Sequence, residues 1–339
     1  MIPHNKPFLG EEEKKIANNV ISSGLISQGA EVLNFENDLC KFFGLAKGHA
    51  VAVSSGSSAL YLALWSLNGK GNRVGIPVYS CSSLRNAVGL IGAKTIFLDC
   101  DDYSPNLSIK QAEQKDIDIL IAPSMFGIPI ELPTNQSYKI IEDLAQSFGA
   151  KVDGEHIGLR GDIGICSFYA TKMFTTGGQG GAIISRDKKL IDKIKDYREF
   201  DCREDSKLRF NFQMTDLQAA IGRVQLKRLP TFIKQREKWF KIYHEIGLNL
   251  IDSKFQNHTP VRYRIVHKCN NPREIINELF KEKVKAIVPI EEFELLDKND
   301  EYLNAHSLTL STVSLPAHLN LSEDDVVRIG SIVKRKGIH

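Results

Sequence analysis

Between residues 50 and 185, short apolar runs alternate with stretches in which apolar positions recur at helical spacing. Apolar positions three and four residues apart predict helices at 57–67 and 82–92. Short, mainly apolar runs predict buried strands at 49–55, 74–79, 95–100, 118–127, 138–145, 162–170 and 181–186. Strands that alternate with helices favour the α/β class, with a mostly parallel sheet covered by helices on both faces.

The pattern changes after residue 215. A long helix is expected from Thr215 to about Leu250, and Pro230 is expected to break or kink it. The remainder is more polar and predicts a smaller α+β unit. Its expected strands are at 261–268 and 285–290, and its expected helices at 272–284 and 322–336. The last helix is expected to begin with Ser322 as N-cap and Asp325 three residues later. We therefore expect two domains: residues 1–225 hold an N-terminal segment and a large α/β domain, and residues 226–339 hold a linking helix and a small C-terminal α+β domain.

Composition narrows the class of protein. The 339 residues carry a formal net charge of only +3, so no nucleic-acid partner is expected. No apolar run is long enough to span a membrane, and the first residues do not resemble a signal peptide. The six cysteines form no C-x-x-C pair and no histidine cluster accompanies them, so we expect no metal site, no disulfide framework and a cytoplasmic location.

A serine-rich turn, Ser54 to Ser58, lies between the first predicted strand and the first predicted helix. Ligands of open α/β sheets bind at the carboxyl ends of the strands, and a helix N-terminus with small residues can bind a phosphate. Taken alone, the turn is an ordinary helix cap. Because the chain has neither G-x-G-x-x-G after this strand nor a G-x-x-x-x-G-K-[ST] motif, it fits a dinucleotide or P-loop site poorly.

Two further strand ends carry candidate chemistry. Asp143 ends a buried strand and could hold a protonated ring nitrogen, with Gln146 close to the same ligand; alone, Asp143 could simply cap a helix. Lys172 follows another strand, five residues after Ser167 and just before the glycines of "GGQGG". A lysine in an enclosed site can form a Schiff base, although most lysines are exposed. Together and in this order, the three strand ends favour pyridoxal 5'-phosphate.

These segments resemble the DegT/DnrJ/EryC1/StrS family of sugar aminotransferases, which are fold type I enzymes dependent on pyridoxal 5'-phosphate. The resemblance is strong over about residues 2–225 and weaker at 305–330. It is carried by "IPHNKPFLGEEE", "SGLISQGAEVLNFE", "VAVSSGSSALYLAL", "IEDLAQSFGA", "GDIGICSFYATKMFTTGGQGGAI", "FNFQMTDLQAAIG" and "VSLPAHLNLSEDD".

The resemblance implies a role for each matching residue. Lys172 would link covalently to the cofactor and serve as catalytic base, and Asp143 would pair with the pyridine nitrogen. Gln146 would lie near the phenolic oxygen, and Cys81 occupies the position where the family often stacks an aromatic ring. The cofactor phosphate would be held by Gly56, Ser57, Ser58 and Ser167, and by Asn211 from a second subunit, so the resemblance implies a homodimer with shared active sites.

The implied reaction transfers an amino group from an amino acid, glutamate or glutamine, to a nucleotide-linked keto-sugar. The product would be an amino sugar for lipopolysaccharide or a related glycan. The chain departs from the family at Met173, usually Asn, at Gln213, usually Arg, and in a shorter C-terminal domain. Two alternatives are a non-catalytic protein that binds the cofactor for regulation, and another fold type I reaction such as desulfuration, which needs a reactive cysteine on a mobile loop.

Overall fold

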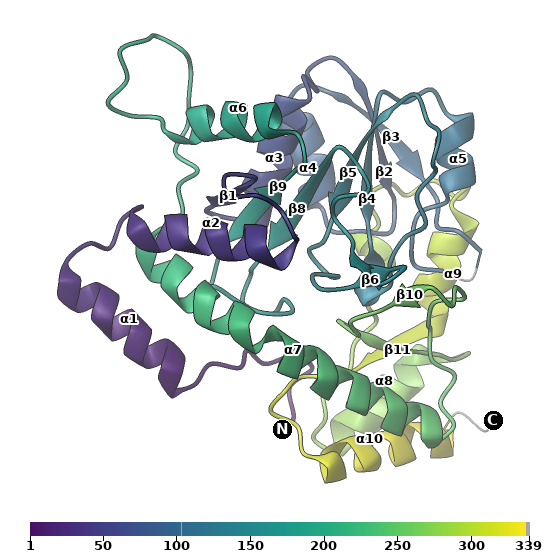
Figure 1. Cartoon of the computed structure of the whole chain (residues 1–339). Helices are drawn as coiled ribbons and strands as arrows, with labels where there is room; N and C mark the ends of the chain where they lie inside the picture. Colours follow the sequence, from purple (N-terminus) through teal and green to yellow (C-terminus); the bar gives the residue numbers. More distant parts are fainter. Residues whose placement is uncertain (103, 337–339) are drawn as a thin grey trace.

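A seven-stranded sheet forms the centre of the computed structural model, which describes residues 1–102 and 104–336 (Figure 1). Its spatial order is β1-β9-β8-β5-β4-β2-β3. Only β9 runs antiparallel to its neighbours, so the predicted mostly parallel sheet is confirmed. The strands are β1 (Ala50–Val53), β2 (Arg73–Pro77), β3 (Lys94–Leu98), β4 (Ile119–Pro123), β5 (Lys139–Asp143), β8 (Ile163–Ser167) and β9 (Gly181–Ile184).

Helices cover both faces of this sheet. One face packs against α3 (Gly56–Ser66), α4 (Ser83–Leu90) and α6 (Lys188–Arg198), and the other against α2 (Ala30–Phe42) and the first half of α7 (Asp216–Glu245). Side chains of β1 alternate between the two cores: Val51 and Val53 belong to the first, and Ala50 and Ala52 to the second. Successive side chains of a strand point to opposite faces of the sheet, and both faces are covered here, so a fully buried strand is apolar at every position.

The long helix α7 links the two ends of the molecule. Its first turns contact α1 (Glu11–Ser23) and α2, and its later turns contact α10 (Glu323–Lys336). The expected break at Pro230 is wrong, because the helix continues from Asp216 to Glu245 with the proline inside it. A capping box of Thr215 with Gln218 stabilises its start, and buried packing on both sides of the proline offsets the lost hydrogen bond.

The C-terminal residues build a smaller core over one end of the sheet. Helices α8 (Pro272–Lys281) and α10 enclose a two-stranded sheet of β11 (Ile265–Lys268) and β12 (Thr312–Leu315), and α9 (Leu303–Ser311) precedes β12. A small three-stranded sheet joins β10 (His258–Thr259), β6 (Lys151–Val152) and β7 (Glu155–His156). The predicted strand at 285–290 is wrong: it reduces to a single bridge from Ile287 to β12. The predicted cap of α10 is confirmed, since Asp325 N–H donates to Ser322 Oγ at 3.1 Å.

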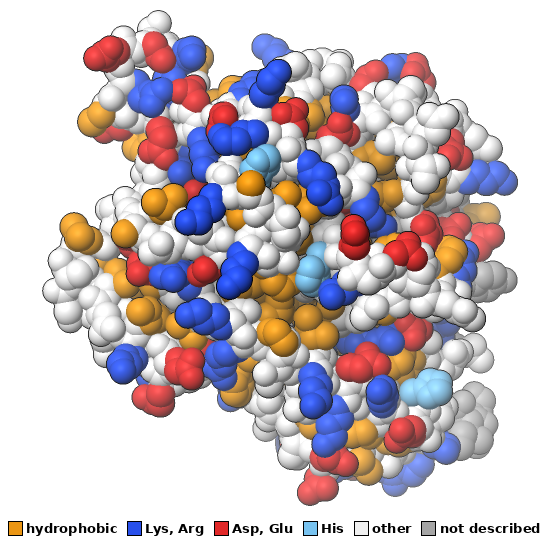
Figure 2. All heavy atoms as spheres, viewed as in Figure 1, with side chains coloured by type: hydrophobic (Ala, Val, Ile, Leu, Met, Phe, Trp, Pro, Cys, Tyr) orange, Lys and Arg blue, Asp and Glu red, His pale blue; other side chains and the backbone are white. Residues whose placement is uncertain are grey.

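The surface is mixed, with basic and acidic side chains interspersed on the face drawn in Figure 2. A loop between α6 and α7 projects from the body of the molecule (Figure 1). None of the helices in the described part of the chain combines the length and apolar character needed to cross a bilayer.

Candidate active site

Three predicted site residues meet at one edge of the sheet. Asp143 is the last residue of β5 and pairs in register with Ile165 of the adjacent β8. Lys172 lies in the loop that leaves β8, and Gly56 begins α3 directly after β1. Because β1, β5 and β8 point in one direction, their carboxyl ends carry these residues to a common edge.

The start of α3 forms a close-packed cradle. Ser55 is the N-cap, and its Oγ accepts the Ser58 N–H at 3.0 Å. A Cβ added to Gly56 would lie 2.8 Å from Ser167 Cβ, so only glycine allows this approach of α3 to β8. The first N–H groups of a helix have no intrahelical partner and attract anions. The turn therefore fits the phosphate group that the sequence predicts.

The serine hydroxyls of this turn face different surroundings. Ser57 Oγ donates to Ser83 Oγ at 3.2 Å, and Ser83 Oγ lies 3.4 Å from Cys81 Sγ. These contacts bring the predicted phosphate turn beside Cys81, whose side chain is exposed. Ser58 Oγ instead lies within the turn, 3.0 Å and 2.8 Å from the hydroxyls of the serines at positions 54 and 55.

Asp143 is a buried carboxylate without an arginine or lysine in direct contact among the described residues. Its Oδ1 accepts the Ala145 N–H at 2.8 Å. Burial raises the pKa of this carboxyl, while the Ala145 N–H and the charge of Lys172 oppose the shift. A protonated ring nitrogen would supply the cationic partner that the protein does not place against this carboxylate.

Lys172 faces a cavity of about 470 Å³ that opens at the same edge. Its Nζ lies 5.4 Å from the ring centroid of Tyr263, a buried residue of the C-terminal part. Burial raises the pKa of Tyr263, but the charges of Lys172 and Arg264 outweigh burial and leave the pKa below its usual value. The cavity is also lined by Gln146 and Cys81, so the structure brings these predicted residues together with Lys172.

A strained turn forms part of the cavity wall. Phe126 has a left-handed backbone with φ 60°, and its N–H donates to Gln146 Oε1 at 2.8 Å. A Cβ on the next residue, Gly127, would lie 2.8 Å from the backbone nitrogen of Tyr263. Positive φ in a bulky residue is costly and is often found at functional sites. The turn therefore fixes Gln146 and Tyr263 relative to each other.

Asn211 lies apart from this cavity. It is exposed on the loop after α6, and its Oδ1 accepts the Gln213 N–H at 3.0 Å. Gln213 itself bridges to the end of β1. The Asn211 side chain is not among those lining the cavity of its own chain.

Several residues at the site were given no role from the sequence. Tyr263 and Arg264 belong to a stretch that the sequence presents only as a weak strand, and Phe126 belongs to a loop at the carboxyl end of β4. The N-terminal segment also contributes, since Asn5 Nδ2 donates to the carbonyl oxygen of Thr171, next to Lys172. The position of Phe126 at a strand end is the one signal that could have identified any of them.

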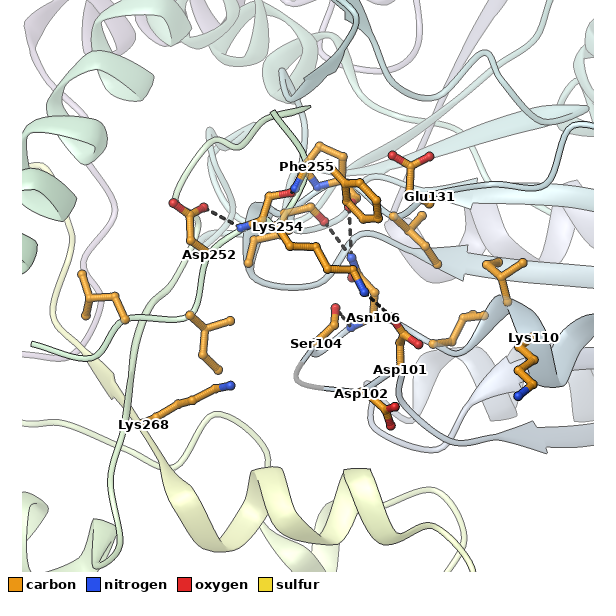
Figure 3. Close-up of a pocket in the computed structure, with 18 of the residues that line it drawn as sticks. Asp101, Asp102, Ser104, Asn106, Lys110, Glu131, Asp252, Lys254, Phe255 and Lys268 are labelled. Carbon is orange, nitrogen blue, oxygen red and sulfur yellow. Dashed lines mark hydrogen bonds and ion pairs between the residues drawn. The ribbon is translucent and has the colours of Figure 1, made fainter. Parts of the chain in front are cut away.

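A larger cavity of about 500 Å³ lies between the loop after β3 and the segment after α7 (Figure 3). None of the predicted site residues lines it. Two of its polar groups bond within the protein: Lys254 Nζ lies 3.3 Å from Asp101 Oδ2, and the Asn106 amide donates to two backbone carbonyl groups. The cavity that contains Lys172 is therefore the candidate active site.

Comparison with known proteins shows the family of the chain. Residues 7–334 match the model of the DegT/DnrJ/EryC1/StrS aminotransferase family. The chain is 28% identical to GDP-perosamine synthase of Escherichia coli O157:H7, over 97% of this chain and 96% of that protein. It is 32% identical to the spore coat polysaccharide biosynthesis protein SpsC of Bacillus subtilis, over 70% and 67% of the two chains. The crystal structure of the aminotransferase TlmJ from Streptoalloteichus hindustanus superposes with a TM-score of 0.89 and 25% identity, covering 99% of this chain and 98% of that one.

Proposed function

The chain belongs to the DegT/DnrJ/EryC1/StrS aminotransferase family, and from this premise we propose that it transfers an amino group from an amino-acid donor to a nucleotide-linked keto-sugar. The family is dependent on pyridoxal phosphate, and the fold is that of fold type I aminotransferases. The observation that carries the proposal is the meeting of Lys172, Asp143 and the Gly56 cradle at one sheet edge.

Each of these groups has a distinct task in the proposal. When bound, the cofactor supplies an electron sink for the carbon that loses its proton. Asp143 holds the proton on the ring nitrogen, because a buried carboxylate strongly favours a cationic partner. Lys172 would anchor the cofactor, and its amine would take up the proton that the donor's α-carbon loses. The α3 turn and Ser167 would hold the phosphate, and Gln146 would lie near the phenolic oxygen.

Support for a sugar nucleotide comes from the cavity and from the relatives. The named relative makes GDP-perosamine. In this chain, Arg85 and Lys298 line the cavity and are both exposed to solvent, so they lie at its rim. Cationic side chains at a rim suit a diphosphate that remains partly solvated. The product in this proposal is an amino sugar for a surface glycan, and the enzyme acts in the cytoplasm.

The proposed enzyme is a homodimer whose two active sites are shared. Leu208 and Phe210 project from the loop after α6 with 93% and 65% of their surfaces exposed, and Asn211 follows them. Exposed apolar side chains on a projecting loop suit an interface with a second copy. Asn211 would then reach the phosphate at the partner's site. We also propose the division after residue 225, although that boundary falls within the continuous helix α7.

The absorption spectrum of the cofactor-loaded protein tests the proposed reaction. L-glutamate should bleach the near-visible band, and a keto-sugar nucleotide should restore it. Lys172→Ala should abolish turnover, whereas the exposed Lys94→Ala should not. Normal transaminase activity in purified Lys172→Ala would contradict the assignment, and a spectrum that no amino acid changes would favour a binding protein.

Shared sites are tested by mixing two inactive variants. Lys172→Ala and Asn211→Ala each damage one part of a site, and a hybrid dimer retains one intact site. Random subunit exchange should therefore recover about a quarter of the wild-type activity. If the mixture stays as inactive as its components while sedimentation shows hybrid dimers, Asn211 does not act across the interface.

A further inference from the structure

Arg264 is a half-buried cation in the active-site cavity without an acidic partner. Its Nη1 lies 3.4 Å from Ser314 Oγ, and no carboxylate in residues 1–102 or 104–336 forms an ion pair with it. The acidic residue that lines the same cavity, Glu294, is engaged elsewhere, since its Oε2 accepts the Glu291 N–H at 2.9 Å. A partly desolvated guanidinium with one long hydrogen bond has unused donors.

The backbone holds Arg264 rigidly relative to the cofactor residues. Its N–H donates to the Phe126 carbonyl oxygen at 3.2 Å, and the Val261 N–H donates to the Gly127 carbonyl oxygen at 3.0 Å. The same Phe126 turn bonds Gln146. A strained turn that is bonded on both sides leaves little freedom for Arg264 to move away from the cavity.

Arg264 and Lys172 line the same cavity and lie near the same aromatic ring. Arg264 Cζ lies 5.7 Å from the ring centroid of Tyr263, and Lys172 Nζ lies 5.4 Å from the same centroid. The two cationic groups therefore share one aromatic neighbour. Arg85 and Lys298, by contrast, are exposed at the rim.

Further positive charge lies behind this wall. Arg236 is 4% exposed, and its guanidinium donates to the Tyr263 carbonyl oxygen at 2.9 Å. Its Nε has no hydrogen-bond partner, and no acidic side chain of the described chain pairs with it. Arg264 in the cavity wall and Arg236 behind it, neither paired with a carboxylate among the residues described, give this end of the cavity a positive potential, which favours an anionic ligand.

We infer that Arg264 binds a carboxylate of the amino-acid donor. In an amino acid, the α-carboxylate is attached to the carbon that carries the reacting amine, so it must lie near Lys172. The diphosphate of a sugar nucleotide is separated from the reacting carbon by part of the sugar ring, which matches the rim. The planar guanidinium suits a carboxylate, which it can bind through two parallel hydrogen bonds. This inference rests on the proposed function for its choice of ligand.

The test compares Arg264→Met and Arg264→Lys with wild type, and uses Arg328→Met, an exposed arginine on α10, as the matched control. The first half-reaction is followed as bleaching of the cofactor band by L-glutamate. Binding of glutarate, a dicarboxylate without an amine, is measured by calorimetry on the loaded enzyme. Circular dichroism and the cofactor absorbance before donor addition confirm that each variant is folded and loaded.

Loss of the charge-assisted hydrogen bonds should lower the second-order rate constant for glutamate by about 10- to 100-fold in Arg264→Met. Glutarate affinity should fall by a similar factor, Arg264→Lys should recover part of both, and Arg328→Met should match wild type. A similar loss with L-glutamine identifies the α-carboxylate as the group bound, and a loss confined to glutamate identifies the side-chain carboxylate.

Wild-type behaviour of Arg264→Met in both measurements would overturn the inference. If instead the wild-type spectrum responds to no amino acid, the proposed function fails. Glutarate binding then still decides whether Arg264 recognises carboxylates.

Discussion

Protonation of His4 provides a quantitative test of how the N-terminal segment, which contacts the loop that carries Lys172, contributes to the free energy of unfolding. His4 Nε2 lies 2.9 Å from Ser314 Oγ, and the next residue, Asn5, donates to the Thr171 carbonyl oxygen. Burial, followed by the charges of Arg264 and other nearby basic groups, lowers the pKa of His4 from 6.5 to about 3. The folded chain therefore keeps this imidazole neutral at pH values where the unfolded chain binds a proton.

The size of the effect follows from that shift. The contribution of neutral His4 to the free energy of unfolding is fully present above pH 6.5. It decreases as the pH is lowered from 6.5 to about 3, because only the unfolded chain is protonated at this position in that window. Each pH unit in this window changes the free energy of unfolding by about 1.4 kcal/mol. Lowering the pH from 7.5 to 5 should therefore remove about 2 kcal/mol through His4 alone.

Urea unfolding at pH 7.5 and pH 5, followed by tryptophan fluorescence, measures this contribution. His4→Gln can still donate to Ser314 but cannot titrate, so it should lose about 2 kcal/mol less than wild type over the same interval. The exposed His244→Gln serves as control and should follow wild type. Parallel losses in wild type and His4→Gln would refute the reasoning, since His4 would then not be held neutral by the fold.

Three further outcomes are expected. Gly56→Ala places a Cβ 2.8 Å from the Cβ of the last residue of β8, so equilibrium dialysis should show about 10-fold weaker cofactor binding in a folded protein. Glu142→Ala removes a carboxylate that is 2% exposed and leaves Arg160 without its ion-pair partner, which should lower the free energy of unfolding by about 3 kcal/mol in urea titrations. Bound cofactor should slow alkylation of Cys81 several-fold, whereas alkylation of the exposed Cys202 should not change; peptide mass spectrometry measures both rates. Equal protection of the two thiols would place Cys81 outside the site.

Local patterns predicted the sheet and its flanking helices well. The runs around β1 and β4 are apolar at nearly every position because each strand is covered on both faces, and this signal needs no partner to be identified. The expected break at Pro230 and the predicted strand at 285–290 were wrong because packing decided them. Helix α7 continues through the proline because its packing contacts stabilise it, and Ile287 pairs with β12 through a single bridge.

The sequence by itself determined which groups stand at the carboxyl ends of the strands: Gly56, Asp143 and Lys172 follow three strands that point the same way. The tertiary structure alone decided what closes the site around them. Tyr263 and Arg264 reach the cavity because the C-terminal part packs across the sheet edge and bonds to the Phe126 turn. Contacts between segments more than a hundred residues apart leave no periodic trace in either segment, so no local pattern could reveal these residues.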